Sequence, residues 1–296
     1  MITLAHISDI HLSPLPHITA KELLSKRITG YVNWKLKRSR FMQRDTLTNL
    51  VTHMQNNRPH LTIVTGDLVN LASHNEMVMA QNWLEKLGPP EKVCAIPGNH
   101  DAYVRGSLED AHKNWGPYMS GERLDDNPFP YVRRIGDVAI IGCSSAVPRP
   151  PFIASGQIST AQSERLAQYL EILGKAGFFR IVLIHHPPIA QYARSWRKGL
   201  RGAKGFRDAI KNDGAELVLH GHLHRSLINA LPGPTHEVPV IGVASATARA
   251  DHGEQPARYN FFKVERLASR WSCTLTEYGY QRIGDKIVNR LQMRLY

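Results

Sequence analysis

The chain has 296 residues and a net charge of +12, with 42% hydrophobic and 21% charged residues, which suits one large α/β domain or two small ones. No apolar run reaches the roughly 18 residues of a transmembrane helix, and the stretch after Met1 lacks the features of a signal peptide. The three widely spaced cysteines, Cys94, Cys143 and Cys273, lie in apolar runs typical of reduced core residues, so we expect a cytoplasmic protein, with peripheral contact to the inner face of a membrane left open.

Short apolar runs bounded by Gly, Pro, Asn or Asp predict strands along the whole chain. They are residues 2–8, 61–67, 92–98, 137–145, 180–186, 215–221, 238–245, 258–265 and 270–278. Helical spacing predicts helices between several of them, most clearly over 45–54 and over 159–173, where Ser159 and Gln162 form an N-cap pattern. Alternation of strands and helices implies a largely parallel, buried sheet.

The last third of the chain has a different pattern. From about Glu237 the strands follow one another without a helix until one that we predict near Val288. This suggests a second, antiparallel-rich sheet packed on the first. We find no repeat, low-complexity tract or linker, so residues 1–296 are predicted to form a single domain.

A basic insert at about residues 14–42 follows the first strand. Between residues 21 and 40 it has seven Lys or Arg and a single acid, Glu22, a net charge of +6. Thr19 and Glu22 form a capping-box pattern, and Leu24, Ile28 and Tyr31 are spaced for one helix face. The pattern fits a helical hairpin and a kinked helix equally.

Five polar motifs each follow a predicted strand. They are Asp9 with His11, Gly66-Asp67, Asn99-His100-Asp101, His185-His186, and His222 with His224. Ligands gather beyond the carboxyl ends of strands in open α/β sheets, so the five motifs can converge on one site. Asp, Asn and His without a thiolate suit Mn, Fe, Zn or Co. Each motif alone occurs by chance, but the ordered set indicates a metal site.

In this order the motifs resemble those of the calcineurin-like metallophosphoesterases, in particular the bacterial phosphodiesterase-like branch, over about three quarters of the chain. The resemblance implies an α/β fold, a four-layer αββα sandwich with two packed mixed β-sheets and a dinuclear metal centre at the carboxyl ends of the strands. It implies seven metal ligands. Asp9, His11 and His224 would hold one ion, Asn99, His185 and His222 the other, and Asp67 would bridge both. We choose His185 over His186 because the family ligand usually lies two residues before the proline.

The resemblance implies metal-dependent phosphoester hydrolysis, and we favour a phosphodiester as the substrate. The attacking group would be a hydroxide formed at two Mn, Fe or Zn ions. His100 is predicted to stabilise the phosphoryl group or protonate the leaving oxygen. Asp101 is predicted to orient His100 or to cap a helix. The alternatives are a phosphomonoesterase, a lipid hydrolase at the membrane surface, a non-catalytic metal-binding scaffold and a nuclease.

The basic segments predict an anionic phosphoester substrate and leave contact with an anionic membrane open. The second segment, residues 194–211, also has a net charge of +6, and its Arg197, Lys198 and Arg201 are predicted to bind substrate. In the insert, Tyr31 and Trp34 are predicted to form a wall of the pocket. The competing interpretations are a solvated basic helix and aromatic residues that only fix the insert to the core. Nucleic acid is not expected as a partner, and the oligomeric state is left open.

Overall fold

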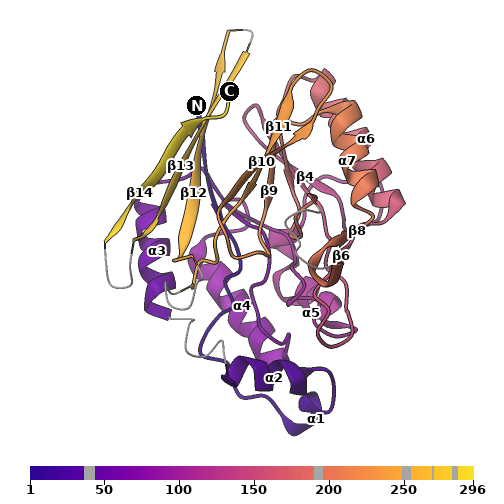
Figure 1. Ribbon diagram of the computed structural model, residues 1–296, viewed down its shortest axis with the longest axis vertical. Helices are drawn as coiled ribbons and strands as arrows, with labels where there is room; N and C mark the ends of the chain where they lie inside the picture. The colour runs from indigo at the N-terminus through magenta and orange to yellow at the C-terminus, as the bar shows by residue number, and fades with distance from the viewer. Residues whose placement is uncertain (37–43, 190–195, 249–254, 269, 282–285) are drawn as a thin grey trace.

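Two six-stranded sheets face each other across the centre of the molecule (Figure 1). The computed structural model describes residues 1–36, 44–189, 196–248, 255–268, 270–281 and 286–296. The first sheet has the order β14 (Ile287–Arg294), β13 (Arg270–Tyr280), β12 (Arg258–Leu267), β1 (Ile2–Ile7), β2 (Leu61–Val64) and β3 (Val93–Ala95). Strands β1, β2 and β3 are parallel, and β12, β13 and β14 extend the sheet in antiparallel fashion.

The second sheet is mostly parallel. Its order is β10 (Leu227–Pro232), β11 (Glu237–Gly242), β9 (Leu217–His220), β7 (Phe179–Leu183), β5 (Val138–Gly142) and β4 (Tyr131–Ile135). Only the two edge strands, β10 and β4, are antiparallel to their neighbours. A separate parallel pair joins β6 (Gly156–Gln157) and β8 (Leu200–Arg201) near the carboxyl ends of this sheet (Figure 1).

Alternate residues of the central strand β7 point into two different cores. Ile181 and Leu183 lie in the core that both sheets share. Val182 and the following Ile184 lie in a second core beneath the helices α6 (Thr160–Lys175) and α7 (Ala203–Asp213). Because successive strand residues face opposite sides, a strand that is buried throughout must be covered on both faces.

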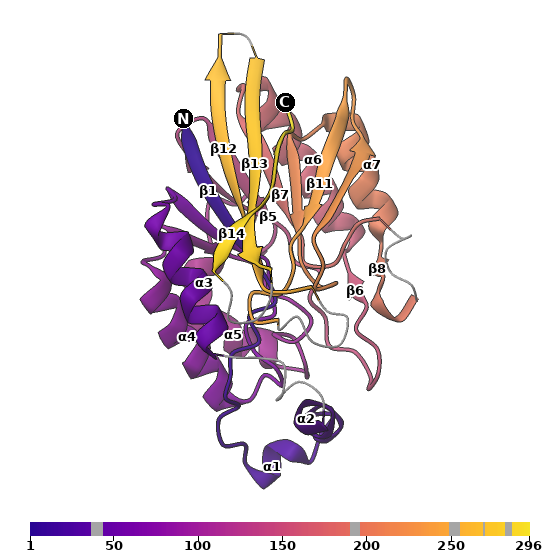
Figure 2. The same cartoon turned by 60° about the vertical axis from the view of Figure 1, so that its left-hand side comes forward.

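Helices also cover the outer face of the first sheet. These are α3 (Arg44–Asn56), α4 (His74–Leu87) and α5 (Ser107–Trp115), which is followed by the 3-10 turn η2 (Gly116–Met119). Figure 2 shows them on the side opposite α6 and α7. The layers are therefore helix, sheet, sheet, helix, which confirms the four-layer sandwich.

The predicted insert forms two short helices, α1 (Ala20–Leu23) and α2 (Arg27–Leu36), at the end of the molecule towards which the carboxyl end of β1 points (Figure 2). The capping box of Thr19 and Glu22 is confirmed. Residues 37–42 of the insert lie outside the described ranges.

Two expectations for the last third are wrong. The segment near Val288 is strand β14, which pairs with the edge of β13, so tertiary pairing overrides its local helical spacing. The C-terminal strands do not build a separate sheet, because β12 pairs with β1 and completes the first one.

The prediction for the three cysteines holds, since all are buried and free. Within the described ranges, no helix combines the length and apolar character needed to cross a bilayer.

Candidate metal centre

All seven predicted ligands follow the carboxyl end of a strand. The first sheet contributes Asp9 and His11 after β1, Asp67 after β2 and Asn99 after β3, and the second contributes His185 after β7 and His222 and His224 after β9. Except for His222 and His224, which are partly exposed, these side chains are buried. The site therefore lies where the two sheets meet.

Five of these residues have a left-handed backbone, which is uncommon outside glycine. Their φ values are 52° for Asp9, 41° for His11, 57° for Asp67, 71° for His222 and 53° for His224. Both residues of the Asp9–His11 pair and both residues of the His222–His224 pair adopt this conformation. Such backbone conformations cost about 1–3 kcal/mol each and cluster at functional sites, where the surrounding structure maintains them.

The first donor set brings Asp9, His11 and His224 together. His224 Nε2 lies 3.3 Å from Asp9 Oδ1 and 3.4 Å from His11 Nε2. An ion about 2.0–2.2 Å from each donor needs donors about 3–3.5 Å apart, so these separations fit a first-row metal. The structure thus groups the three residues that the resemblance assigned to one ion.

The second donor set is formed by Asn99, His185 and His222. Asn99 Oδ1 lies 3.2 Å from His185 Nε2 and 2.9 Å from His222 Nδ1. These separations again match atoms that share one ion.

Asp67 lies between the two sets. Its Oδ2 is 3.7 Å from His11 Nε2 and 3.4 Å from His185 Nε2. Its other oxygen, Oδ1, accepts a hydrogen bond of 2.8 Å from the backbone N–H of His100. One oxygen is therefore fixed by the protein, and the other faces both donor sets.

Three histidines of the site have their second ring nitrogen bound to a backbone carbonyl. His11 Nδ1 donates to Val69 at 3.1 Å, His185 Nδ1 to Thr65 at 2.6 Å, and His222 Nε2 to Lys198 at 3.1 Å. In the neutral imidazole, the nitrogen facing the centre then carries a lone pair. Lone pairs and carboxylate oxygens converge on the same points, an arrangement that a cation would stabilise.

The electrostatics of the centre favour positive charge. Burial alone would raise the pKa of Asp67, but His185, His100 and His11 hold that pKa well below its ordinary value. Burial opposes a charge on His185, yet the Asp67 carboxylate raises the pKa of His185 to about 9. The site therefore attracts a proton in the absence of metal, and metal ligation would have to displace it.

His186 has no ring nitrogen left for a metal. Its Nε2 donates to the carbonyl of Ala154 at 3.0 Å, and its Nδ1 lies 2.8 Å from Ser145 Oγ. Its ring packs against His222, with centroids 4.4 Å apart. The contacts favour His185 as the ligand of the pair and give His186 a supporting role.

Asp101 contacts the loop that carries Asp67. Its two oxygens accept hydrogen bonds of 2.8–3.2 Å from the backbone N–H groups of Gly98, Asp67, Leu68 and Val69. Because a carboxylate has about four acceptor positions, none is left to orient His100 or to cap a helix, and this detail of the sequence prediction is corrected. Burial and the neighbouring Asp67 carboxylate raise the pKa of Asp101 to about 7.

His100 lies beside both donor sets and borders a pocket. Its Nδ1 donates to the carbonyl of Asn70 at 2.6 Å, and its ring stacks on Tyr103 with centroids 5.6 Å apart. The pocket has a volume of about 260 Å³. Besides Asn99 and His100 it is lined by Lys26, Thr29, Gly30, Asn33, Tyr103, Val147, Arg149, Phe152, Ile153 and Ala154.

The predicted substrate-binding residues lie in different places. Tyr31 and Trp34 do not line this pocket, and Tyr31 packs against the core that the two sheets share. Arg197 and Lys198, in the 3-10 turn η4 (Trp196–Lys198), are exposed, and the carbonyl of Lys198 binds the His222 ring. Arg201 is exposed on β8 and close enough to Arg149 to lower the pKa of that guanidinium, an effect that adds to the larger one of burial.

The pocket wall itself was missed by the sequence analysis. Lys26, Tyr103 and Arg149 come from three segments that share no motif. One signal was present for Arg149, because it lies in the loop that leaves the carboxyl end of β5.

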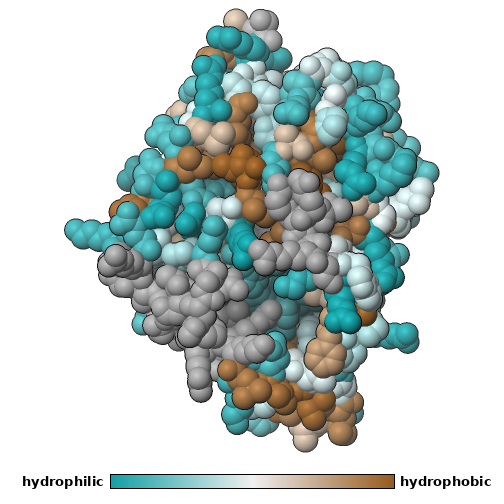
Figure 3. Space-filling view, viewed as in Figure 1, coloured by the Kyte–Doolittle hydropathy of each residue, from teal (hydrophilic) through white to brown (hydrophobic). Residues whose placement is uncertain are grey.

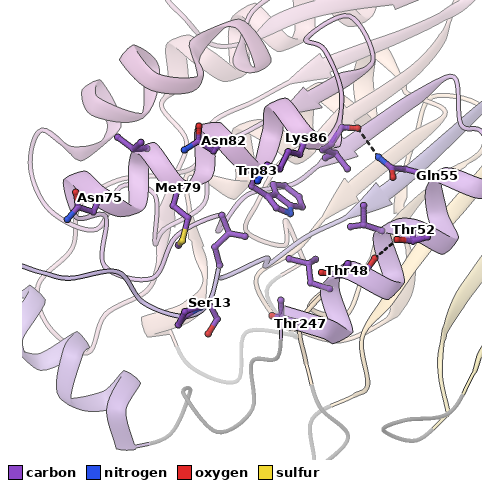
Figure 4. A pocket seen from close by; sticks show the side chains of 16 residues that line it. Ser13, Thr48, Thr52, Gln55, Asn75, Met79, Asn82, Trp83, Lys86 and Thr247 are labelled. Carbon is purple, nitrogen blue, oxygen red and sulfur yellow. Dashed lines mark hydrogen bonds between the residues drawn. The ribbon is translucent and has the colours of Figure 1, made fainter.

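A larger groove of about 620 Å³ lies between α3 and α4, away from the predicted ligands. Figure 4 shows Met79 and Trp83 of α4 facing Thr48 of α3 across it. None of the predicted site residues lines this groove.

Comparison with known proteins identifies several similar chains. The family model for calcineurin-like phosphoesterases matches residues 2–226. A Synechococcus protein described as a probable cyclic nucleotide phosphodiesterase is 25% identical over 268 residues, which are 89% of this chain and 88% of the relative. A dimetal phosphatase from Danio rerio has a TM-score of 0.63 at 13% identity, covering 98% of this chain and 99% of that one. The sulfate thiohydrolase SoxB from Thermus thermophilus has a TM-score of 0.53 at 14% identity, covering 92% of this chain and 56% of that one. At such identities the two structures show a shared fold.

Proposed function

Because the chain belongs to the calcineurin-like phosphoesterase family, and is thus a metal-dependent phosphoester hydrolase, we propose that its substrate is a small anionic phosphodiester. The Synechococcus relative, described as a probable cyclic nucleotide phosphodiesterase and similar over nearly the whole chain, supports the diester. The pocket of about 260 Å³ beside His100 supports a small leaving group.

The observation that carries this function is the position of Asp67 Oδ2 between two donor sets. In the proposal Asp9, His11 and His224 hold one ion, Asn99, His185 and His222 hold the second, and Asp67 holds both. Oxygen and imidazole donors without thiolate favour Mn, Fe or Zn. When bound, two such ions neutralise phosphoryl oxygens and lower the pKa of water.

His100 is the proposed catalytic residue that binds no metal. Because its Nδ1 donates to Asn70, Nε2 is the ring nitrogen that would act on the substrate. Stacking on Tyr103 fixes the plane of the ring. As an imidazolium, His100 would donate the Nε2 proton to a phosphoryl oxygen or to the departing alkoxide. Asp101 is proposed as a positioning residue, which acts through the backbone of the Asp67 loop.

Positive charge beside the pocket supports an anionic substrate. Lys26 and Arg149 line the pocket, and Arg201 lies close to Arg149. Neither Arg149 nor Arg201 forms an ion pair with an acid among the described residues. Because Nε and Nη2 of Arg149 already donate to residues 155–157, the two neighbouring guanidinium groups would attract phosphate oxygens mainly by their positive charge.

The proposal is tested with metal-defined protein and two aryl phosphates. Loaded with Mn, the protein should hydrolyse bis-p-nitrophenyl phosphate with a kcat/KM at least about tenfold above that for p-nitrophenyl phosphate, because the diester can fill the side pocket. The opposite order would identify a phosphomonoesterase. Absence of turnover with both compounds and with cyclic nucleotides, at two bound ions, would contradict the proposal.

A His100→Asn variant separates catalysis from metal binding. It should retain both ions and lose about 10²–10⁴-fold in kcat for the diester. His112→Asn is the matched control, because His112 is also half-buried with Nδ1 bound to a backbone carbonyl, that of Leu108, and lies on α5. Loss of metal from the His100→Asn variant would show that His100 serves the metal centre instead.

A further inference from the structure

The outer face of the insert carries an apolar stripe. Leu24, Ile28, Val32 and Leu36 are spaced four residues apart, and they are 87%, 53%, 50% and 67% exposed. In the space-filling view a brown patch covers the end of the molecule where α1 and α2 lie (Figure 3). Surface helices of globular proteins normally turn their polar face outwards. Helix α2 has the opposite orientation, because its apolar face is the one exposed to solvent.

This orientation is fixed by contacts on the inner face of α2. Arg27 donates from Nε to the carbonyl of Leu71 at 3.0 Å and from Nη2 to that of Ala72 at 2.6 Å. A Cβ atom on Gly30 would lie 2.2 Å from Tyr103 Oη, so the helix backbone is pressed against the body of the protein. The helix therefore cannot roll to bury its apolar stripe without losing these contacts.

A further exposed apolar side chain lines the pocket from a segment other than the insert. Phe152 is 83% exposed and lines that pocket together with Thr29 and Asn33 of α2. Trp196, 63% exposed, belongs to the turn whose Arg197 carbonyl accepts from the backbone of Ala154. Helix α2, which carries the stripe, and the exposed Phe152 thus both border the pocket.

The charge around the stripe is positive. Lys21 and Lys35 are exposed beside it. The one acid of α1 is Glu22, whose carboxylate accepts hydrogen bonds from the backbone N–H groups of Thr19 and His74. Apolar side chains flanked by lysines suit the headgroup region of an anionic bilayer, where burial of the former and attraction of the latter act together.

We propose that the stripe of α1 and α2, with Phe152, docks on the surface of an anionic lipid bilayer and holds the pocket mouth at the level of the headgroups. A second copy of the chain fits less well. Four aliphatic side chains, each smaller than the aromatic ones that bury about 150–250 Å², cannot supply the roughly 800 Å² per partner of a stable interface. Two such faces would also bring their lysines together.

The test is co-sedimentation of the full-length protein with vesicles of phosphatidylcholine, with and without 30 mol% phosphatidylglycerol (about the anionic content that gives a strong surface potential). Wild type should bind the anionic vesicles and bind neutral ones at least about tenfold more weakly. The double variant Ile28→Glu with Val32→Glu should lose at least about tenfold in partitioning. The matched control is Ile172→Glu on α6, a site 52% exposed and remote from the insert, and it should bind as wild type does.

Folding and function are monitored separately from docking. The double variant should retain its metal content, thermal midpoint and turnover of soluble bis-p-nitrophenyl phosphate, because both side chains point to solvent. Failure of wild type to bind anionic vesicles, or equal binding by the double variant, would overturn the proposal. So would a wild-type dimer that the double variant breaks without any vesicle binding, since a second copy would then be the partner. Vesicle binding does not depend on turnover, so this result is distinct from any failure of the proposed function.

Discussion

The carboxylate of Asp67 divides its two oxygens between the protein and the candidate metal centre. Oδ1 is held by the backbone N–H of His100, and Oδ2 faces His11 and His185. The left-handed backbone of Asp67 is in turn supported by Asp101, which binds its N–H at 2.8 Å. A change at Asp67 should therefore affect both ion sites directly, whereas a change at Asp101 should affect them indirectly, through the Asp67 loop.

We expect Asp67→Ala to lose both ions, as measured by elemental analysis of the dialysed protein, and to lose activity with them. Asp101→Asn should retain both ions at saturating metal but bind them about 10–100-fold more weakly, the usual effect of losing an outer partner, because an amide N–H₂ would face backbone donors. Asp137→Ala, an exposed acid near Arg266, is the control. Two tightly bound ions in Asp67→Ala would rule out the bridging role.

The positive charge that Lys26 places in the pocket depends on pH. Its ammonium lies 4.1 Å from the centre of the Tyr103 ring, and burial lowers the pKa of Lys26 to about 8. The positive charge is therefore present below about pH 8 and is lost as the pH rises through that value. We expect the KM for bis-p-nitrophenyl phosphate, whose own charge is constant in this range, to rise above pH 8.

The Lys26→Arg variant provides the control for this pH dependence, because a guanidinium stays protonated to above pH 12. Its KM should show no step near pH 8, and the KM of Lys26→Met should be high throughout. An unchanged step in Lys26→Arg would assign the titration to another group.

At the scale of elements, helix α2 forms one wall of the pocket, and its position depends on Gly30. A Cβ atom there would lie 2.2 Å from Tyr103 Oη and 2.5 Å from Leu71 Cδ2. Gly30→Ala gains about 1 kcal/mol in helix propensity, but overlap with two packed side chains costs about 1–3 kcal/mol. We expect α2 to shift, with a higher KM and a small change in kcat.

Two further variants check this explanation. Adding Tyr103→Phe to Gly30→Ala removes the nearest atom and should recover part of the KM. Gly116→Ala, where no atom lies within 4 Å of the added Cβ, should leave KM unchanged. An unaltered KM in Gly30→Ala would mean that α2 is not fixed at this contact.

The sequence predicts a helix or strand correctly where its local residue pattern agrees with its position in the folded chain. Strand β1 and the Asp9–His11 pair could be found because an apolar run ends directly before the ligands. Strand β14 was mistaken for a helix because its pairing with β13 is decided by an open sheet edge far away in the sequence. The wall of Lys26 and Arg149 was missed for a related reason, since only the folded chain brings them to one pocket.

At the scale of the whole molecule, each candidate ion site takes ligands from both sheets. Asp9, His11, Asp67 and Asn99 come from the first sheet, and His185, His222 and His224 from the second. The sheets are also joined by the shared core, and the pairing of β1 with β12 joins the first strand to the last third of the chain. This arrangement supports the single domain that we propose for residues 1–296.

Metal removal should therefore destabilise the whole fold. Ligands that bind only the native state stabilise it by about 2.7 kcal/mol at a free concentration of 100 Kd, so two ions contribute roughly 5 kcal/mol. For a chain of this size we expect EDTA to lower Tm on the order of 10 °C, as measured by differential scanning calorimetry. In Asp67→Ala, which should hold no ions, EDTA should have little effect. If EDTA strips the ions from wild type, as elemental analysis would verify, and Tm does not change, then the ions do not connect the two sheets.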